Sequence, residues 1–253
     1  MKMQYALVNG SRHEPEPKLR GTCPNCDAEV VAKCGQQRVW HWAHLGKLEC
    51  DHWWEPETEW HRAWKALFPK DWHEVVHVAP DGERHIADLK SREGLVVEFQ
   101  HSPITPSERL SRESFYQMMV WVADGTRYLR DITNFRQSME YASVVRDSPM
   151  YLRPARQDAA LFRRWTPIKC PVFIDFGNEQ FRPAGLPVPD DVLWQLLIDR
   201  STGGAIVAAV TRESFVQYCA TGSALQHLVV HRSQPKRPQR TRYYRQRQQR
   251  YRL

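Results

Sequence analysis

The alternation of apolar and polar residues predicts three consecutive β-strands in the middle of the chain. Turn residues separate the strands, Pro80-Asp81-Gly82 in the first gap and Arg92-Glu93-Gly94 in the second. A helix is predicted before the strands, where aromatic residues recur at three- and four-residue spacing, and another after them, where Thr105 and Pro106 suit a helix start. In order, the predicted elements are a helix at 55–68, strands at 72–79, 84–90 and 95–101, a helix at 106–118 and a strand at 118–123.

The hairpin between the second and third strands brings polar side chains together. Its three-residue loop, with Gly94 at the left-handed position, places Asp88 opposite Glu98. Alternation along the strand then puts Gln100 on the same face. Two opposed carboxylates repel each other, so we predict a cation between them. A bound Mg²⁺ is the economical explanation.

The cysteines are distributed unevenly, with four of the six between residues 23 and 50. This clustering favours metal ligation over disulfides. Cys23-Pro-Asn-Cys26 has the spacing of a zinc knuckle. The predicted structural zinc ligands are Cys23, Cys26, His44 and Cys50, with His41 as a substitute for Cys50. His41 and His44 are expected to face opposite sides of one strand, and Cys34, Cys170 and Cys219 are expected to be unligated. The alternative is a set of buried thiols with a packing histidine.

The net charge of +7 comes from the C-terminal end of the chain. Residues 232–253 hold nine of the 36 basic residues and no acidic one, which leaves 27 basic against 29 acidic side chains in residues 1–231. We predict a tail that is disordered when free and whose Arg and Tyr residues suit phosphate contact and base stacking. The candidate contacts are Arg240, Arg242, Arg245 and Arg247. The alternative is a solvated terminus that binds nothing specific.

Four regions are expected: 1–54, a zinc-binding module; 55–125, the core; 126–231, a C-terminal α/β extension; and 232–253, the basic tail. Residues 126–165 show no clear pattern. Beyond them we predict strands at 171–176 and 180–182, a helix at 189–199, a strand at 204–210 and a helix at 211–220. These elements either extend the main sheet or form an accessory domain. Because no apolar run is long enough for a membrane span or a signal peptide, we expect a cytoplasmic protein without a membrane partner.

Several motifs follow one another over roughly residues 20–125. They are Cys-Pro-x-Cys at 23–26, His-Trp-Ala-His at 41–44, Cys50, Glu57-Thr-x-x-His61-x-x-x-Lys65, Arg84-x-x-Ala-Asp88, Glu98-Phe-Gln100-x-Ser102-Pro-Ile104, Arg112-x-x-x-Tyr116 and Trp121-Val122. In their order and spacing, these motifs resemble the competence protein CoiA family. The order of elements in the core resembles the PD-(D/E)XK, or restriction-endonuclease-like, nuclease fold.

The resemblance implies an α/β (α+β) nuclease in which Asp88 and Glu98 hold Mg²⁺ or Mn²⁺. Glu57, His61 and Lys65 lie on one stripe of the predicted helix 55–68. By the resemblance, Glu57 looks like a second metal ligand or a general base, and His61 looks like a phosphate-orienting group. Gln100 stands where many relatives have lysine, and an amide carries no charge. The candidates for the missing cation are Lys65 and Lys90.

The second predicted helix carries Arg112 and Tyr116 one turn apart. They either bind the DNA backbone or cap and pack the helix, and the sequence favours neither role. His101 and Ser102, at the end of the third strand, are candidates for substrate contact.

We expect a nucleic-acid partner, above all DNA, and a metal-dependent nuclease with a role in DNA uptake or recombination. One alternative is a zinc-containing nucleic-acid-binding protein without catalysis. Another is an RNA-directed or phage-defence nuclease.

Overall fold

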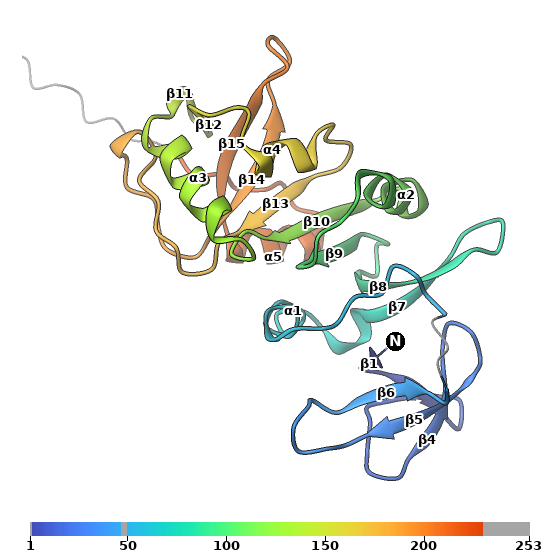
Figure 1. Cartoon of the computed structure of the whole chain (residues 1–253). Coiled ribbons are helices and arrows are strands. Elements are labelled where there is room, and N and C mark those ends of the chain that lie inside the picture. Colours follow the sequence, from blue (N-terminus) through green and yellow to red (C-terminus); the bar gives the residue numbers. More distant parts are fainter. Residues whose placement is uncertain (1, 47–49, 230–253) are drawn as a thin grey trace, which may run out of the picture.

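The computed structural model describes residues 2–46 and 50–229, which form two β-sheets (Figure 1). The first sheet has the strand order β1-β6-β5-β4-β2-β3. Its packed interior includes Met3, Val30 and Trp42. The strands are β1 (Lys2–Met3), β2 (Ala6–Val8), β3 (Ser11–His13), β4 (Arg20–Thr22), β5 (Glu29–Lys33) and β6 (His41–His44).

The second sheet has nine strands within the described residues, in the order β11-β12-β15-β14-β13-β10-β9-β8-β7. At its centre β9, β10 and β13 run parallel, and the other neighbours are antiparallel. The strands are β7 (His73–Val78), β8 (Arg84–Lys90), β9 (Val96–Gln100), β10 (Met119–Asp124), β11 (Ser143–Asp147), β12 (Met150–Arg153), β13 (Val172–Asp175), β14 (Val192–Ile198) and β15 (Ala205–Thr211).

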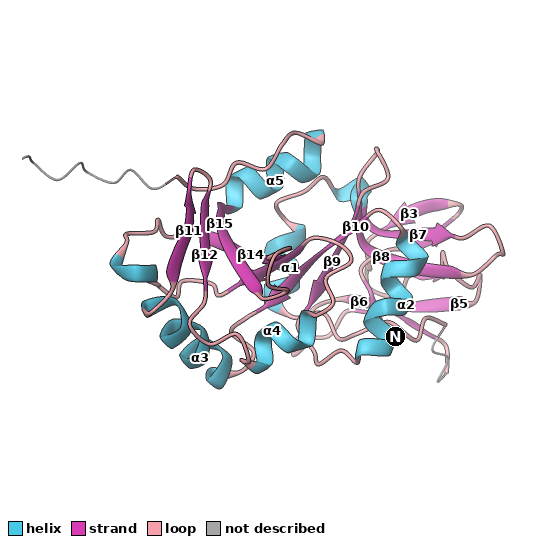
Figure 2. Ribbon diagram, turned by 90° about the horizontal axis from the view of Figure 1, so that it is seen from above, coloured by secondary structure: helices cyan, strands magenta, loops and turns pink. Residues whose placement is uncertain are grey.

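Helices cover both faces of the second sheet, with α5 on one side and α3 and α4 on the other (Figure 2). On the α5 side, Trp64 of α1 stacks on Phe99 and meets Phe215 of α5. On the opposite side, Trp121 packs against Trp165 of α4. The helices are α1 (Glu59–Lys65), α2 (Pro106–Tyr116), α3 (Leu129–Glu140), α4 (Ala160–Trp165) and α5 (Arg212–Thr221), with 3₁₀ turns at Lys70–Trp72 and Pro183–Gly185.

The predicted hairpin is present with the predicted register. Leu89 pairs with Val97, and the Ser91 amide donates to the Leu95 carbonyl at 2.8 Å. Gly94 has a positive φ of 89°, as the loop requires. This register sets Asp88 opposite Glu98. The predicted mixed α+β architecture is confirmed, and the finer assignment to a restriction-endonuclease-like core stays a prediction.

The first predicted helix is shorter than expected. It begins after Thr58, whose side chain accepts from the His61 amide while the His61 ring accepts from the Thr58 amide, a reciprocal capping box. Residues 55–57 therefore precede the helix. The prediction that Glu57 shares a helical stripe with His61 and Lys65 was wrong, because the helix begins at Glu59, after the Thr58 cap, and Glu57 precedes both.

The helix predicted at 189–199 was also wrong, since this segment contains β14. Its residues Val192–Leu196 are all buried between β13 and β15. A central strand buried on both faces has no polar alternation, so its apolar run resembles that of a buried helix. The segment 180–182, predicted as a strand, lies outside the strands of the described chain.

The predicted boundary at residue 125 does not divide the sheet. β10 pairs in parallel with β13, and Val122 stands opposite Phe173. Residues 126–229 therefore extend the main sheet, which is one of the two arrangements considered for them. No helix in the described part of the chain is long and apolar enough to cross a membrane.

Candidate functional site

Three cysteines and one histidine converge beside the first sheet. The ligand atoms of Cys23, Cys26, His44 and Cys50 all lie within 4.8 Å of one another. Tetrahedral zinc with Zn–S bonds of about 2.3 Å separates two sulfur ligands by roughly 3.8 Å. The Cys23 and Cys50 sulfurs are 3.8 Å apart, and the Cys26 sulfur is 3.3 Å from His44 Nε2. The predicted cluster is confirmed as one that could hold a metal such as zinc.

Local backbone geometry creates this cluster. Cys23 follows β4, and a tight turn returns the Asp27 amide to the Cys23 carbonyl at 3.0 Å. The Asn25 amide points at the Cys23 sulfur from 3.4 Å. His44 ends β6 and is buried, whereas His41 bonds the Val39 carbonyl through Nδ1 and is outside the cluster. The four primary candidates are therefore the better set, and His41 is not the substitute.

Burial opposes ionisation of two thiols of the cluster. Burial raises the pKa of the Cys50 thiol to about 12 and raises that of Cys23 as well. At neutral pH these two thiols are therefore protonated in the absence of a metal, whereas a bound ion would favour the thiolates. Among the described residues, Cys34, Cys170 and Cys219 are free thiols outside the cluster, as predicted.

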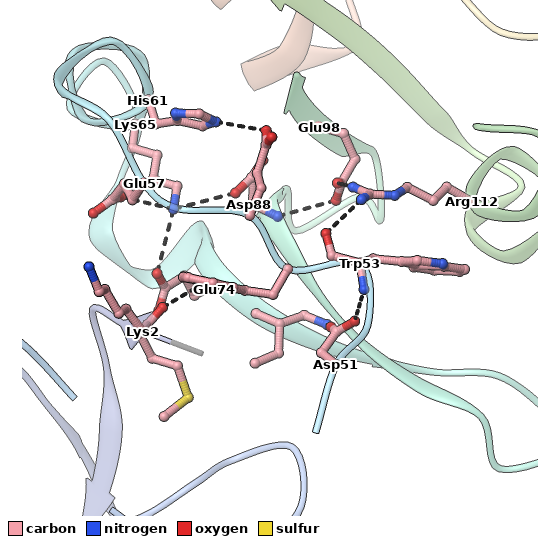
Figure 3. Close-up of a pocket in the computed structure, with 14 residues that line it drawn as sticks. Lys2, Asp51, Trp53, Glu57, His61, Lys65, Glu74, Asp88, Glu98 and Arg112 are labelled. Atoms are coloured by element: carbon pink, nitrogen blue, oxygen red, sulfur yellow. Dashed lines mark hydrogen bonds and ion pairs between the residues drawn. The ribbon is translucent and has the colours of Figure 1, made fainter. Parts of the chain in front are cut away.

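A second candidate site is a cavity of about 50 Å³ between the hairpin, α1 and the N-terminal strand (Figure 3). Six carboxylates line it against three permanent cations, so negative charge is in excess by three when all are ionised. The charged lining residues are Asp51, Glu55, Glu57, Glu74, Asp88 and Glu98, and Lys2, Lys65 and Arg112.

Lys65 lies at the centre of three of these carboxylates (Figure 3). Its Nζ is 3.1 Å from Glu57, 3.4 Å from Asp88 and 3.5 Å from Glu74. Burial opposes its charge, but the charges of Asp88, Glu74 and Glu57 raise the pKa of Lys65 above its usual range. The ammonium is therefore a fixed cation, and at neutral pH it cannot act as a base. Of the two lysines considered for the missing cation, Lys65 is the one beside Asp88.

The carboxylate pair itself opens the ladder between β8 and β9. The Asp88 amide donates to the Glu98 side chain at 3.3 Å, and the Phe99 amide donates to the Asp88 side chain at 2.9 Å. Each acid thus replaces a cross-strand carbonyl as the acceptor. Burial and the charge of Asp88 raise the pKa of Glu98 to about 8. The pair cannot hold two negative charges easily unless a further cation is present.

Arg112 of α2 is the counter-ion of Glu98. Its guanidinium is 3.1 Å from the Glu98 carboxylate and donates to the Trp53 carbonyl at 2.6 Å. Both Arg112 and Tyr116 are buried, with 5% and 3% of their surfaces exposed. Their burial does not fit a direct contact with a DNA backbone, and the alternative role in packing the helix agrees with the structure.

Glu55 is a partly buried carboxylate that the sequence did not single out. It accepts hydrogen bonds from His61, from the His101 amide at 3.2 Å and from the Ser102 amide at 3.0 Å. Burial opposes its ionisation, but these donors, His61 first, hold the pKa of Glu55 at about 2. His61 Nε2 also meets the Phe99 carbonyl at 3.0 Å. Because His61 Nδ1 accepts a hydrogen bond from the Thr58 amide, both ring nitrogens of His61 have partners.

A second carboxylate that sequence reasoning missed is Asp175, at the end of β13. One of its oxygens accepts from Trp60 at 2.9 Å and from Trp64 at 2.8 Å. The other accepts from the Gly177 amide and from Arg212 of α5. Asp175 therefore fixes α1 against the sheet and so positions Lys65. The sequence contains little sign of this role, because Trp60 and Trp64 are more than a hundred residues from Asp175 in the chain.

Two of the predicted catalytic residues, Gln100 and Lys90, are not among the residues that line this cavity. Gln100 donates to the Ser102 carbonyl at 2.9 Å, and Lys90 Nζ meets His77 Nδ1 at 3.0 Å. His101 bonds Asp124 at 2.7 Å at the carboxyl ends of the parallel strands. The four tail arginines fall outside the described residues. The structure thus brings together six residues of the predicted set, Glu57, His61, Lys65, Asp88, Glu98 and Arg112.

These observations define a mixed α+β protein with a Cys₃His cluster and a carboxylate-lined cavity. A model of the competence protein CoiA N-terminal domain matches residues 17–52, which include all four cluster residues. Competence protein CoiA of Bacillus subtilis (strain 168) is 26% identical over 146 residues, covering 53% of this chain and 39% of that protein. The chain thus spans about two-fifths of the length of this relative. No solved structure matches. The predicted resemblance to CoiA is confirmed.

Proposed function

We propose that the protein is a divalent-metal-dependent nuclease that acts on DNA, in a process like that of its competence relative. The observation that carries the proposal is the opposed pair Asp88 and Glu98, in a cavity where carboxylates outnumber cations. Hard divalent cations prefer such oxygen ligands, so the donor set fits Mg²⁺ or Mn²⁺. Both acids would hold the ion, and Glu57 is the candidate for a further ligand or a base.

A bound divalent ion supplies Lewis-acid stabilisation of a phosphodiester and lowers the pKa of water. The chain's own residues prepare the site for this. Arg112 and the Asp88 amide orient Glu98, and Lys65 orients Asp88 while providing the positive charge that Gln100 lacks. Glu74 accepts from the Gln4 and Tyr5 amides and so joins the N-terminal segment to the same cluster.

The test compares wild type with Asp88→Asn and Glu98→Gln, which keep the shape and remove the charge. Wild type should cleave DNA with Mn²⁺ or Mg²⁺, and each variant should lose activity on the order of 100-fold or more. Mn²⁺ affinity, measured by calorimetry, should fall with it. Asp190→Asn, an exposed carboxylate bonded to Gln180, is the matched control. Absence of cleavage by wild type, or equal cleavage by the variants, would refute the proposal.

The structure also favours a second candidate, a nucleic-acid-binding protein without catalysis. Lys65 already occupies a position 3.4 Å from Asp88, where it competes with a metal ion. The same experiment separates the two candidates. DNA binding by wild type without Mn²⁺ binding at the acid pair, and without cleavage, would support this second function.

A further inference from the structure

A larger groove lies beside the carboxylate cavity and is not used by the proposed chemistry. Its volume is about 450 Å³, within the range of sites that take small molecules or parts of larger ones. It runs between the 34–40 loop of the first sheet and the start of α1. It shares Lys2, Met3 and Glu57 with the carboxylate cavity. The other lining residues are Gln4, Gln37, Arg38, Val39, Trp40, His41, Glu59 and Arg62.

Trp40 presents an aromatic ring to this groove. Its surface is 48% exposed, although a tryptophan is usually covered. The indole Nε1 donates to the Gly35 carbonyl at 3.2 Å, so the polar edge of the ring is satisfied within the loop. What remains for a ligand is the apolar ring itself. A ring held in place by its own edge suits stacking, because little side-chain freedom is lost on binding.

Positive charge and amide groups surround the ring. Arg38 lies two residues before Trp40 and is exposed, and it has no ion-pair partner among the described residues. Gln37 precedes it, and the 34–40 loop contains no acidic residue. On the facing wall, Arg62 of α1 is 3.2 Å from Glu57, which also lines the carboxylate cavity. Arg38 and Arg62 therefore both line the groove, together with the acidic residues Glu57 and Glu59.

We propose that this groove binds single-stranded nucleic acid, with a base stacked on Trp40 and backbone phosphate near Arg38 and Arg62. The inference rests on the proposed function and adds the strandedness of its substrate. A duplex stacks its bases on one another and offers no free base face, whereas an unpaired strand does. Exposed aromatic rings interleaved with basic residues are the usual means of holding such a strand. The shared lining residues would lead the strand to the carboxylate cavity.

The test is fluorescence anisotropy of the full chain with a labelled oligothymidylate, without added divalent metal, so that cleavage does not interfere. Trp40→Ala should weaken binding roughly 5- to 100-fold, the range measured for loss of one stacking platform. Trp40→Phe should restore most of the affinity. Tyr141→Ala, a 72% exposed aromatic outside the groove, is the matched control and should change nothing. Arg38→Ala should weaken binding less than Trp40→Ala does, and the effect of Arg38→Ala should be larger at low salt than at high salt.

Salt separates the groove from the basic C-terminal residues. Ionic contacts weaken steeply as salt rises, whereas the fold-change caused by Trp40→Ala should stay nearly constant. A hairpin duplex of equal length should lose little affinity in the same variant. Equal affinities of Trp40→Ala and Tyr141→Ala for the single strand, or equal losses on single strand and duplex, would overturn the inference. Thermal melting of each variant excludes misfolding as the cause.

The outcomes also separate this inference from the nuclease proposal. In an Asp88→Asn background, Trp40→Ala should weaken single-strand binding by the same factor as in the wild-type background, because Asp88 does not line the groove. If binding depends on Trp40 but the protein never cleaves DNA, the groove inference is supported and the nuclease proposal is refuted. If cleavage depends on Asp88 but neither cleavage nor binding depends on Trp40, the nuclease proposal is supported and the groove inference is refuted.

Discussion

The Cys₃His cluster and the carboxylate cavity each bring together several side chains that can bind metal ions. They differ in that lysine and arginine side chains line the cavity with its carboxylates. At the cluster, the Cys23 and Cys50 sulfurs face each other at 3.8 Å, and none of the four ligand residues is a lysine or an arginine. At the cavity, Lys65 and Arg112 each lie within about 3.5 Å of a carboxylate. The first arrangement could hold a metal ion such as zinc. In the second, buried side-chain cations already neutralise part of the carboxylate charge.

The largest expected effect is loss of the metal from the cluster. Cys50→Ala should reduce bound zinc from about one equivalent to near zero, because three ligands do not close a structural site. The melting temperature should fall by roughly 10 °C or more, since metal binding is part of the folding energy of such modules. Metal analysis and calorimetry measure both. Cys34→Ala is the control, and a similar loss in that variant would contradict the assignment of ligands.

The next effect concerns the internal cation of the cavity. Lys65→Met removes a buried ammonium from Glu57, Glu74 and Asp88, and breaking such a buried network costs about 3–5 kcal/mol. Added Mn²⁺ should recover more stability in this variant than in wild type, because the competing charge is gone. Thermal melts with and without Mn²⁺ give the two values. Lys90→Met, whose ammonium bonds His77, should show neither change.

A smaller effect should appear in the pH dependence of stability. The pKa of Glu55 is about 2 in the folded protein, below its ordinary value near 4.5. The unfolded chain therefore binds the proton first, and the contribution of Glu55 is present above pH 4.5 and lost as the pH falls toward 2. It amounts to at most about 3 kcal/mol.

Urea unfolding of wild type and Glu55→Gln across this pH window measures the contribution. The difference between the two proteins should shrink as the pH falls. Glu16→Gln, an exposed carboxylate, is the control. A difference in unfolding free energy that is constant from pH 6 to pH 3 would show that Glu55 acts through packing. Zinc release, measured over the same pH range, distinguishes the titration of Glu55 from acid-induced loss of metal at the cluster.

Local patterns predicted the features that depend on neighbouring residues. The Cys-x-x-Cys spacing and the opposite faces of His41 and His44 led to the cluster. The turn at Gly94 and strand alternation led to the Asp88–Glu98 register. Both arguments use the two-residue period of a strand or the geometry of a short turn. These can be inferred from the identity and spacing of neighbouring residues. The start of α1 shows the limit of such patterns: the helix was predicted from residue 55 but begins at Glu59, after the Thr58 cap, so that Glu57 lies outside it.

Features that depend on distant segments could not be predicted in this way. β14 has the same apolar run as a buried helix, and only its pairing with β13 and β15 makes it a strand. Lys65 and Lys90 were equivalent candidates until the packing of α1 put one of them among the carboxylates. That packing depends on Asp175, which bonds Trp60 and Trp64 across more than a hundred residues.

By itself, the sequence determined the ligands of the cluster, the opposed acids and the arrangement of turns and strands around them. These follow from spacing, from turn geometry and from the alternation of faces along a strand. The tertiary structure decided which cation faces Asp88, that Arg112 is buried against Glu98, and that the groove at Trp40 adjoins the cavity. The physical reason is that burial and charge pairing arise from contacts between segments far apart in the chain, and such contacts leave no local pattern.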